Sequence, residues 1–184
     1  MEPHIYYNKG QHSMHALMGL IGEEKINIAL RHLLKDFAYP RKPTSLDLLN
    51  LFYQQADTAQ KKVIDDLFKR VVFHDFTVHN AKSVQLANGE YETTIDLSTL
   101  KFVVNHANNL EEKERIDEEI EVALFTNFPI EKQADRILLT KHLFTQDRST
   151  LKLRSRELPQ YVQIDPRRLR IDRTPGDNLF KIEK

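Results

Sequence analysis

The spacing of apolar residues in the first 70 positions is typical of α-helices. Apolar side chains recur every three or four residues from position 14 to 21 and again from 26 to 37, so each segment predicts a helix with one buried face. Gly22 lies between the two segments and suits a helix end, because glycine readily adopts the backbone conformation required there. Ser45 and Thr58 are good N-caps for a third and a fourth helix. We therefore expect a compact group of four helices.

From about residue 71 onward, apolar and polar residues alternate instead. The alternation is clearest from Tyr91 to Leu97 and from Ile120 to Leu124, as in strands with one buried face. The dipeptide Asn88-Gly89 is a strong signal for a tight turn between two antiparallel strands. The sequence predicts an α+β protein of two modules, a helical one over residues 1–72 and an antiparallel β-sandwich over residues 73–184.

Composition narrows the classes of function. The 184 residues include 27 Lys or Arg and 27 Asp or Glu, so the formal net charge is zero. A chain without net positive charge has no long-range attraction for phosphates, and we expect no nucleic-acid partner. The absence of cysteine excludes disulfide bonds and cysteine-ligated zinc. No apolar run approaches 18 residues and no signal peptide is visible, so we expect a soluble segment without a transmembrane helix.

A motif near the N-terminus resembles part of a known enzyme family. Tyr7-Asn8-Lys9-Gly10 matches a Y-x-K-G pattern, and the segments 21–27 and 29–31 follow with the spacing of that family. Over about residues 5–70 the chain is similar to zinc aminopeptidases of the aminopeptidase N family (gluzincins), in the part that follows their metal site. Residues 88–97 and 162–178 resemble the C-terminal β-module of a bacterial subgroup in which the peptidase-like domain is fused to an ABC-type permease.

The resemblance implies a role for each module and a catalytic role for Tyr7. Residues 1–72 would be the helical end of a thermolysin-like catalytic domain, and residues 73–184 its C-terminal β-sandwich. In such enzymes zinc polarises the scissile carbonyl and activates a water, while a tyrosine O–H donates a hydrogen bond to the oxyanion of the tetrahedral intermediate. A phenol suits this task because its pKa near 10 keeps the proton on at neutral pH. Lys9 and Gly10 are expected to support the motif without a chemical role.

The metal site of the family is missing from the chain. The family binds zinc through H-E-x-x-H and a distal glutamate and holds the substrate's free amine with G-x-M-E-N, and neither motif is present. We therefore expect an excised piece that has no cofactor of its own and is inactive alone. Its parent would bind zinc upstream and hydrolyse N-terminal peptide bonds. The alternative is a non-catalytic helix and β-sandwich interaction module that serves a permease-associated assembly or binds extended peptide.

The same resemblance defines the expected partners. They are the upstream catalytic domain and the peptide substrate of the parent. A chain lacking that domain is expected to self-associate through apolar side chains of its first helix, namely Met14, Leu17 and Met18. Fusion to a permease implies a parent in the bacterial cytoplasmic membrane.

Three other features have ordinary structural explanations. His12 and His15 lie on one face of the first helix, but no third ligand lies at helical spacing from them. The four arginines of residues 166–173 are neutralised by flanking aspartates, which favours a solvated strand edge. The six glutamates of residues 111–121 favour a solvated loop.

Overall fold

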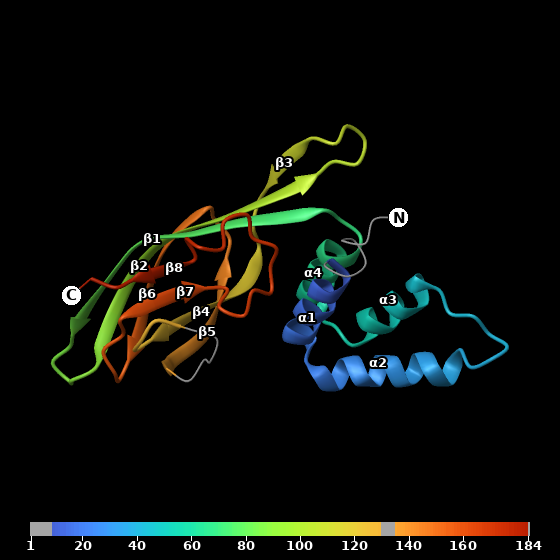
Figure 1. Ribbon diagram of the computed structural model, residues 1–184, viewed down its shortest axis with the longest axis horizontal. Coiled ribbons are helices and arrows are strands. Elements are labelled where there is room, and N and C mark those ends of the chain that lie inside the picture. Colours follow the sequence, from blue (N-terminus) through green and yellow to red (C-terminus); the bar gives the residue numbers. More distant parts are fainter. Residues whose placement is uncertain (1–8, 130–134, 184) are drawn as a thin grey trace. The chain divides into compact units, whose positions relative to one another are not determined.

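The computed structural model describes residues 9–129 and 135–183. Within these residues, four helices precede eight strands, which confirms the expected α+β order (Figure 1). The chain divides into two compact units, Met1–Val71 and Val72–Lys184, which we call the helical unit and the strand unit. Among the described residues, no helix combines the length and the apolar character needed to cross a membrane.

The helical unit is built from four short helices: α1 (Gly10–Ile21), α2 (Glu23–Asp36), α3 (Ser45–Gln54) and α4 (Thr58–Phe68). Gly22 has a positive φ of 93° and its N–H donates to the carbonyl of Met18, so it ends α1 as predicted. The apolar faces of the helices meet in one core that includes Leu17, Ile26, Phe52 and Ile64.

Both predicted N-caps are wrong by one residue. The N-cap of α3 is Thr44, whose extended backbone lets its side chain accept from the N–H of Asp47 while the Asp47 carboxylate accepts from the N–H of Thr44. The N-cap of α4 is Asp57, which exchanges the same two bonds with Gln60. Each pair is a reciprocal capping box, and its acceptor at the third helical position determines where the helix begins.

The strand unit contains two antiparallel sheets. One has the order β1-β2-β3 with β6 also paired to β2, and the other has the order β5-β4-β7-β8. The strands are β1 (Val72–Gln85), β2 (Tyr91–Val104), β3 (Glu111–Glu114), β4 (Glu118–Phe125), β5 (Arg136–Phe144), β6 (Arg148–Ser155), β7 (Tyr161–Ile164) and β8 (Leu179–Lys181).

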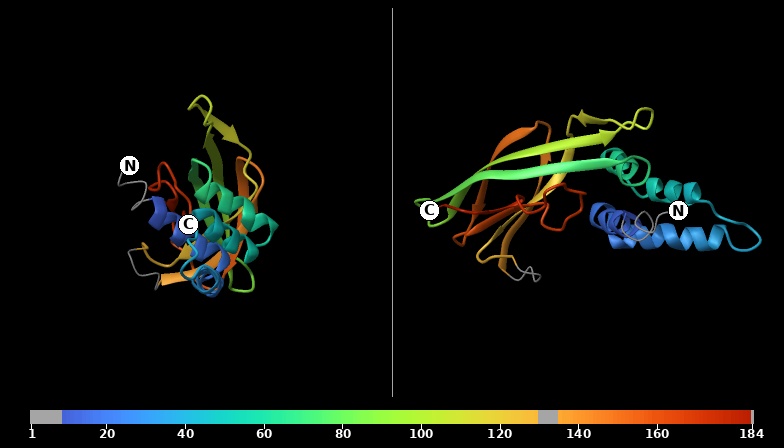
Figure 2. Two further views of the ribbon diagram at one scale, coloured as in Figure 1. Left: turned by 90° about the vertical axis from the view of Figure 1, so that its right-hand side faces the viewer. Right: turned by 45° about the horizontal axis from the view of Figure 1, so that its top comes forward.

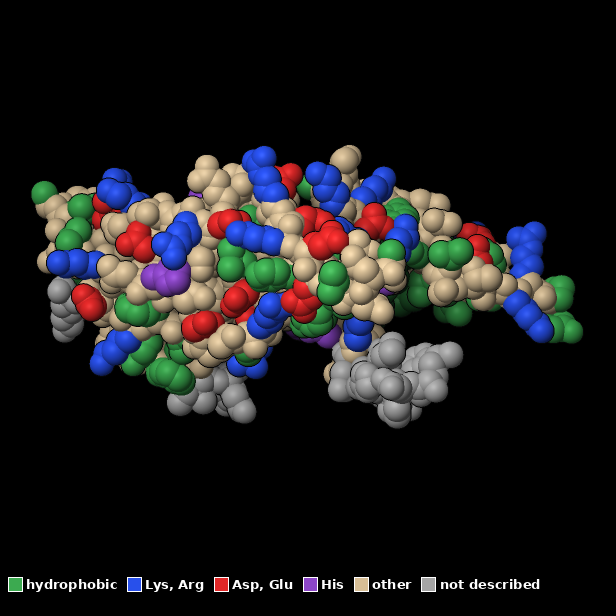
Figure 3. Space-filling model, turned by 90° about the horizontal axis from the view of Figure 1, so that it is seen from above, with side chains coloured by type: hydrophobic (Ala, Val, Ile, Leu, Met, Phe, Trp, Pro, Cys, Tyr) green, Lys and Arg blue, Asp and Glu red, His purple; other side chains and the backbone are tan. Residues whose placement is uncertain are grey.

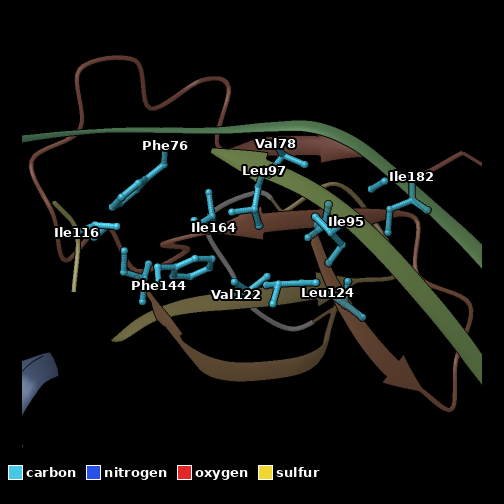
Figure 4. Packing of buried hydrophobic residues seen from close by; sticks show 14 residues of the cluster. Phe76, Val78, Ile95, Leu97, Ile116, Val122, Leu124, Phe144, Ile164 and Ile182 are labelled. Atoms are coloured by element: carbon cyan, nitrogen blue, oxygen red, sulfur yellow. The ribbon is translucent and has the colours of Figure 1, made fainter. Parts of the chain in front are cut away.

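Both sheets contribute to a single hydrophobic core. Side chains of the first sheet, such as Phe76 and Ile95, pack with side chains of the second, such as Val122 and Phe144 (Figure 4). The longest pairing is that of β1 with β2, two 14-residue strands that run side by side (Figure 2). The turn that joins them contains Asn88 and Gly89, as the sequence predicts.

The outer edge of β1 is closed by the C-terminal segment of the unit. The N–H of His74 donates to the carbonyl of Ile171, and the N–H of Val78 donates to the carbonyl of Asp177. Further along the strand, Ser83 and Glu183 are joined by a backbone bond of 3.2 Å. An edge that is paired in this way offers few free backbone groups to another chain.

Candidate functional site

The residue with a predicted catalytic role, Tyr7, lies outside the described residues, and so does the rest of the motif before Lys9. Lys9 itself is described at the N-cap position of α1. Its Nζ donates to the carbonyl of Arg70 at 2.9 Å, just beyond the C-terminus of α4. A cation suits this place, because the last carbonyls of a helix carry partial negative charge.

Two more bonds join α1 to α4 along the same seam. The hydroxyl of Ser13 donates to the carbonyl of Leu67 at 3.1 Å, and the side-chain amide of Gln60 donates to the carbonyl of Leu20 at 3.0 Å. Ser13 is buried, so its hydrogen bond also satisfies a polar group that water does not reach. The three bonds hold α1 against α4 from Lys9 to Leu20.

Replacing Lys9 with methionine is expected to lower the free energy of unfolding of the helical unit by about 1–2 kcal/mol, the range for a partly exposed, charge-assisted hydrogen bond. Burial lowers the pKa of Lys9 from its ordinary value. Urea unfolding followed by circular dichroism measures the change. Lys61→Met on the exposed side of α4 is the matched control, and an equal loss in both variants would contradict the role of Lys9.

The histidines do not form a metal site in the part of the chain that the structure describes. His12 is half-buried and His15 is exposed on α1. Within residues 9–129 and 135–183, no three His, Asp or Glu side chains come together in a group that could hold a metal ion. The described residues therefore do not fit a bound zinc ion.

The most unusual chemistry of the strand unit is a group of buried charges centred on Glu118. Glu118 opens β4 and is 5% exposed. One carboxylate oxygen lies 2.8 Å from Nζ of Lys101 on β2, and the other accepts from Nε of Arg170 at 2.9 Å. Lys101 and Arg170 are themselves only 5% and 7% exposed. Glu118 is thus shared by two buried cations, and Nζ of Lys101 also lies 3.2 Å from the partly exposed carboxylate of Glu114.

A histidine completes this group. Nε2 of His74, on β1, lies 3.5 Å from the Glu118 carboxylate, and its other ring nitrogen is buried without a hydrogen-bond partner among the described residues. Burial alone would raise the pKa of Glu118. The hydrogen bond with His74 and the charges of Arg170, His74 and Lys101 outweigh it and hold the pKa of that carboxyl well below its usual value.

Arg170 belongs to a larger pattern in which arginines 167, 170 and 173 meet glutamates 121, 118 and 111. We call these six residues the charge clasp. Nε of Arg167 donates to Glu121 at 2.7 Å, and Arg173 donates to Glu111 while its guanidinium lies 4.4 Å from the ring centre of Phe102. The clasp ties the C-terminal segment to β3 and β4.

A tight turn directs the arginines of the clasp toward their partners. Asp165 has a positive φ of 47°, a conformation that aspartate tolerates better than most residues. Its carboxylate accepts from the N–H groups of Leu169 and Arg170, both at 2.9 Å. The turn is therefore held by its own first residue, and Arg170 emerges from it facing Glu118.

These contacts correct two expectations from the sequence. The arginine-rich tail is not a solvated strand edge, because Arg170 is buried. The run of glutamates is not a solvated loop, because Glu118 and Glu121 are buried as well. The signal in the sequence is that the arginine run, residues 166–173, and the glutamate run, residues 111–121, carry complementary charges. The charges that flank each run do not reveal this complementarity.

The charge clasp links separate segments of the strand unit through ion pairs. Each of its glutamates is paired with an arginine. Acidic and basic side chains are interspersed on the face seen in Figure 3. No protein-family model and no curated protein matches the chain.

Proposed function

We propose that the chain is the C-terminal part of a zinc aminopeptidase-like protein, in which Tyr7 stabilises the oxyanion of the reaction. The observation that carries the proposal is the Y-x-K-G motif at the entry of α1, together with the second matching segment around Gly22. The hydrogen bond from Lys9 to the carbonyl of Arg70 supports it, because it holds the described part of the motif at the start of α1. Residues 1–72 would complete a thermolysin-like domain, and residues 73–184 would form its β-sandwich.

In this proposal Tyr7 supplies one interaction and no more. Its O–H would donate to the oxygen that gains negative charge as the scissile carbonyl becomes tetrahedral, and the phenol would keep its proton throughout. The described residues of this chain offer no zinc site, so the metal that activates water would belong to the upstream domain.

The surface of α1 supports a partner for the helical unit. The 12 residues of this helix include no Asp, Glu, Lys or Arg, and Met18 is 41% exposed on it. The cores of protein interfaces are depleted in charged residues. The upstream catalytic domain of the parent is the proposed partner. Leu17, which the sequence placed on this surface, is instead fully buried within the helical unit, and Met14 is half-buried.

The same surface favours the second candidate function, a non-catalytic interaction module of a permease-associated assembly. In that case α1 would contact another subunit, and the parent would lack a working metal site. The upstream sequence of the parent distinguishes the two proposals. An upstream H-E-x-x-H followed by a glutamate 18 residues later supports the peptidase, and its loss supports the interaction module.

Self-association of the isolated chain tests the role of α1. Residues 1–184 are expected to sediment above the monomer mass of 21.6 kDa as concentration rises, because the uncharged surface is uncovered. Met18→Glu is expected to restore the monomer. Leu46→Glu, at an exposed apolar position on α3, is the control and should leave the association unchanged. A wild-type chain that stays monomeric at every concentration would contradict the proposal.

A further inference from the structure

The edge strands β1 and β5 differ in what lies along their outer sides. The edge of β1 is closed by the C-terminal segment, as described above. β5 is the last strand of its sheet and pairs only with β4 (Figure 1). Among the described residues, no backbone hydrogen bond reaches the other side of β5 between residues 137 and 143.

The backbone groups that face this open side can be assigned from the bonds of β4. The carbonyl of Glu121 accepts from the N–H of Asp165, and the carbonyl of Phe125 accepts from the N–H of Gln160, so these residues of β4 face β7. In an antiparallel pair the N–H and C=O of a residue point to the same side. Lys141, which lies opposite Glu121, therefore turns its own N–H and C=O away from β4.

The same alternation places the backbone groups of Leu139 and Leu143 on the open side, because these residues lie opposite Ala123 and Glu119. Among the described residues, one side-chain contact reaches these groups, a long one of 3.4 Å from the hydroxyl of Thr140 to the carbonyl of Lys141. Leu139, Lys141 and Leu143 thus form a row of backbone donors and acceptors that pair with no strand among the described residues, at the spacing of an antiparallel strand. We call this row the β5 edge.

The side chains of the β5 edge indicate what would pair with it. Lys141 is exposed and has no ion-pair partner among the described residues, while Leu143 is 53% exposed. The strand from Arg136 to Phe144 contains no Asp or Glu, and the exposed Arg148 follows directly after the next turn. A second copy of β5 would add positive charge to positive charge, whereas an acidic segment would compensate Lys141.

We infer that the β5 edge binds an extended peptide segment by strand addition, with an acidic side chain opposite Lys141 and apolar side chains at the flanking positions toward Leu139 and Leu143. Main-chain bonds to the free edge provide the affinity, and the charge at the centre provides the selectivity, as in other cases of strand addition. This inference is independent of the proposed peptidase function, because it involves no residue of the helical unit.

The test uses the full chain and a labelled, capped heptapeptide rich in threonine, with valine, glutamate and valine at its second, fourth and sixth positions. Fluorescence anisotropy is expected to show binding of this peptide at least about tenfold tighter than that of a matched peptide with lysine at the centre. Hydrogen exchange provides the second readout. The amides of Leu139, Lys141 and Leu143 should exchange fast in the free chain and become protected in the complex, whereas the amide of Thr140 should be protected in both.

Two variants separate the edge from the fold. Lys141→Pro removes an N–H that makes no bond within the sheet, so the midpoint of thermal unfolding should stay close to wild type while binding falls at least about tenfold. Lys141→Glu keeps the backbone and should reverse the preference between the two peptides. Equal binding of both peptides, unchanged binding by Lys141→Glu, or fast exchange of the three amides in the complex would overturn the inference. Self-association through β5 in place of peptide binding would overturn it as well.

Discussion

Replacing Glu118 with glutamine is expected to lower the free energy of unfolding of the strand unit by about 3–5 kcal/mol, the usual cost of removing one partner from a buried ion pair. The loss is large because Lys101 and Arg170 stay buried while their shared carboxylate is gone. A domain has about 5–15 kcal/mol of stability in total, so the variant is expected to be near its unfolding transition at physiological temperature. Urea unfolding followed by circular dichroism measures the change.

An exposed pair in the same unit provides the control. Asp147 and Lys113 form an ion pair with both side chains nearly half exposed, and Asp147→Asn is expected to cost no more than about 1 kcal/mol. A triple variant with methionine at positions 101, 118 and 170 should recover much of the loss, because apolar side chains of similar volume need no charge compensation. If Glu118→Gln and Asp147→Asn lower the free energy of unfolding by the same amount, the buried charges stabilise the unit no more than an exposed ion pair does.

The same carboxylate makes the strand unit sensitive to acid. The pKa of Glu118 is held below its unfolded value of about 4.3, so folding favours the ionised form. The resulting stability is fully present above the unfolded pKa and is lost as the pH falls through the folded pKa. We therefore expect the wild-type free energy of unfolding to decline below about pH 4 more steeply than that of Glu118→Gln, which has no proton to bind at this position.

Tyr7→Phe, made in a parent protein that carries the zinc site, is expected to lower kcat by about 10²–10³ with little change in KM, equivalent to about 2.7–4 kcal/mol of barrier. The effect falls on kcat because the hydrogen bond would form mainly in the transition state, when the carbonyl oxygen carries negative charge. Steady-state kinetics on an aminoacyl anilide measures both constants.

The neighbouring Tyr6 offers a matched control for this experiment. Tyr6→Phe removes the same hydroxyl one residue earlier and is expected to leave kcat close to wild type. A Tyr7→Phe enzyme with full activity would remove this residue from the mechanism. An unchanged KM in both variants, combined with a loss of kcat in one, distinguishes a chemical role from a general disturbance of the helix entry.

The sequence predicts the local structure of the chain well, because local structure depends on neighbouring residues. The change from helical to alternating periodicity near residue 71, the glycine between α1 and α2 and the Asn88-Gly89 turn are all confirmed. The N-caps are displaced by one residue, since Thr44 and Asp57, which precede the predicted caps, are good caps as well. Only the reciprocal bonds to Asp47 and Gln60 distinguish them.

The long-range charge pairs could not be predicted in this way. Arg170 and Glu118 are 52 positions apart, and Arg167 and Glu121 are 46 apart, so no local pattern links them. In the sequence, each of the two runs, residues 111–121 and 166–173, includes charges of the opposite sign, a pattern typical of solvated segments. Which charges meet depends on the path of the chain through two sheets. The catalytic role of Tyr7 stays a prediction, since that residue lies outside the described part of the chain.

The pairing of β1 with the C-terminal segment has a consequence for the order in which the protein acquires its structure during synthesis. The helical unit relies mostly on contacts between neighbouring helices, and such local contacts form early. The strand unit cannot close the edge of β1 until Glu183 has been made, about a hundred residues after Ala81, its partner in that backbone bond. Until then the ribosome-bound chain presents a 14-residue strand with one free side, and this interval is when it is most exposed to wrong pairing.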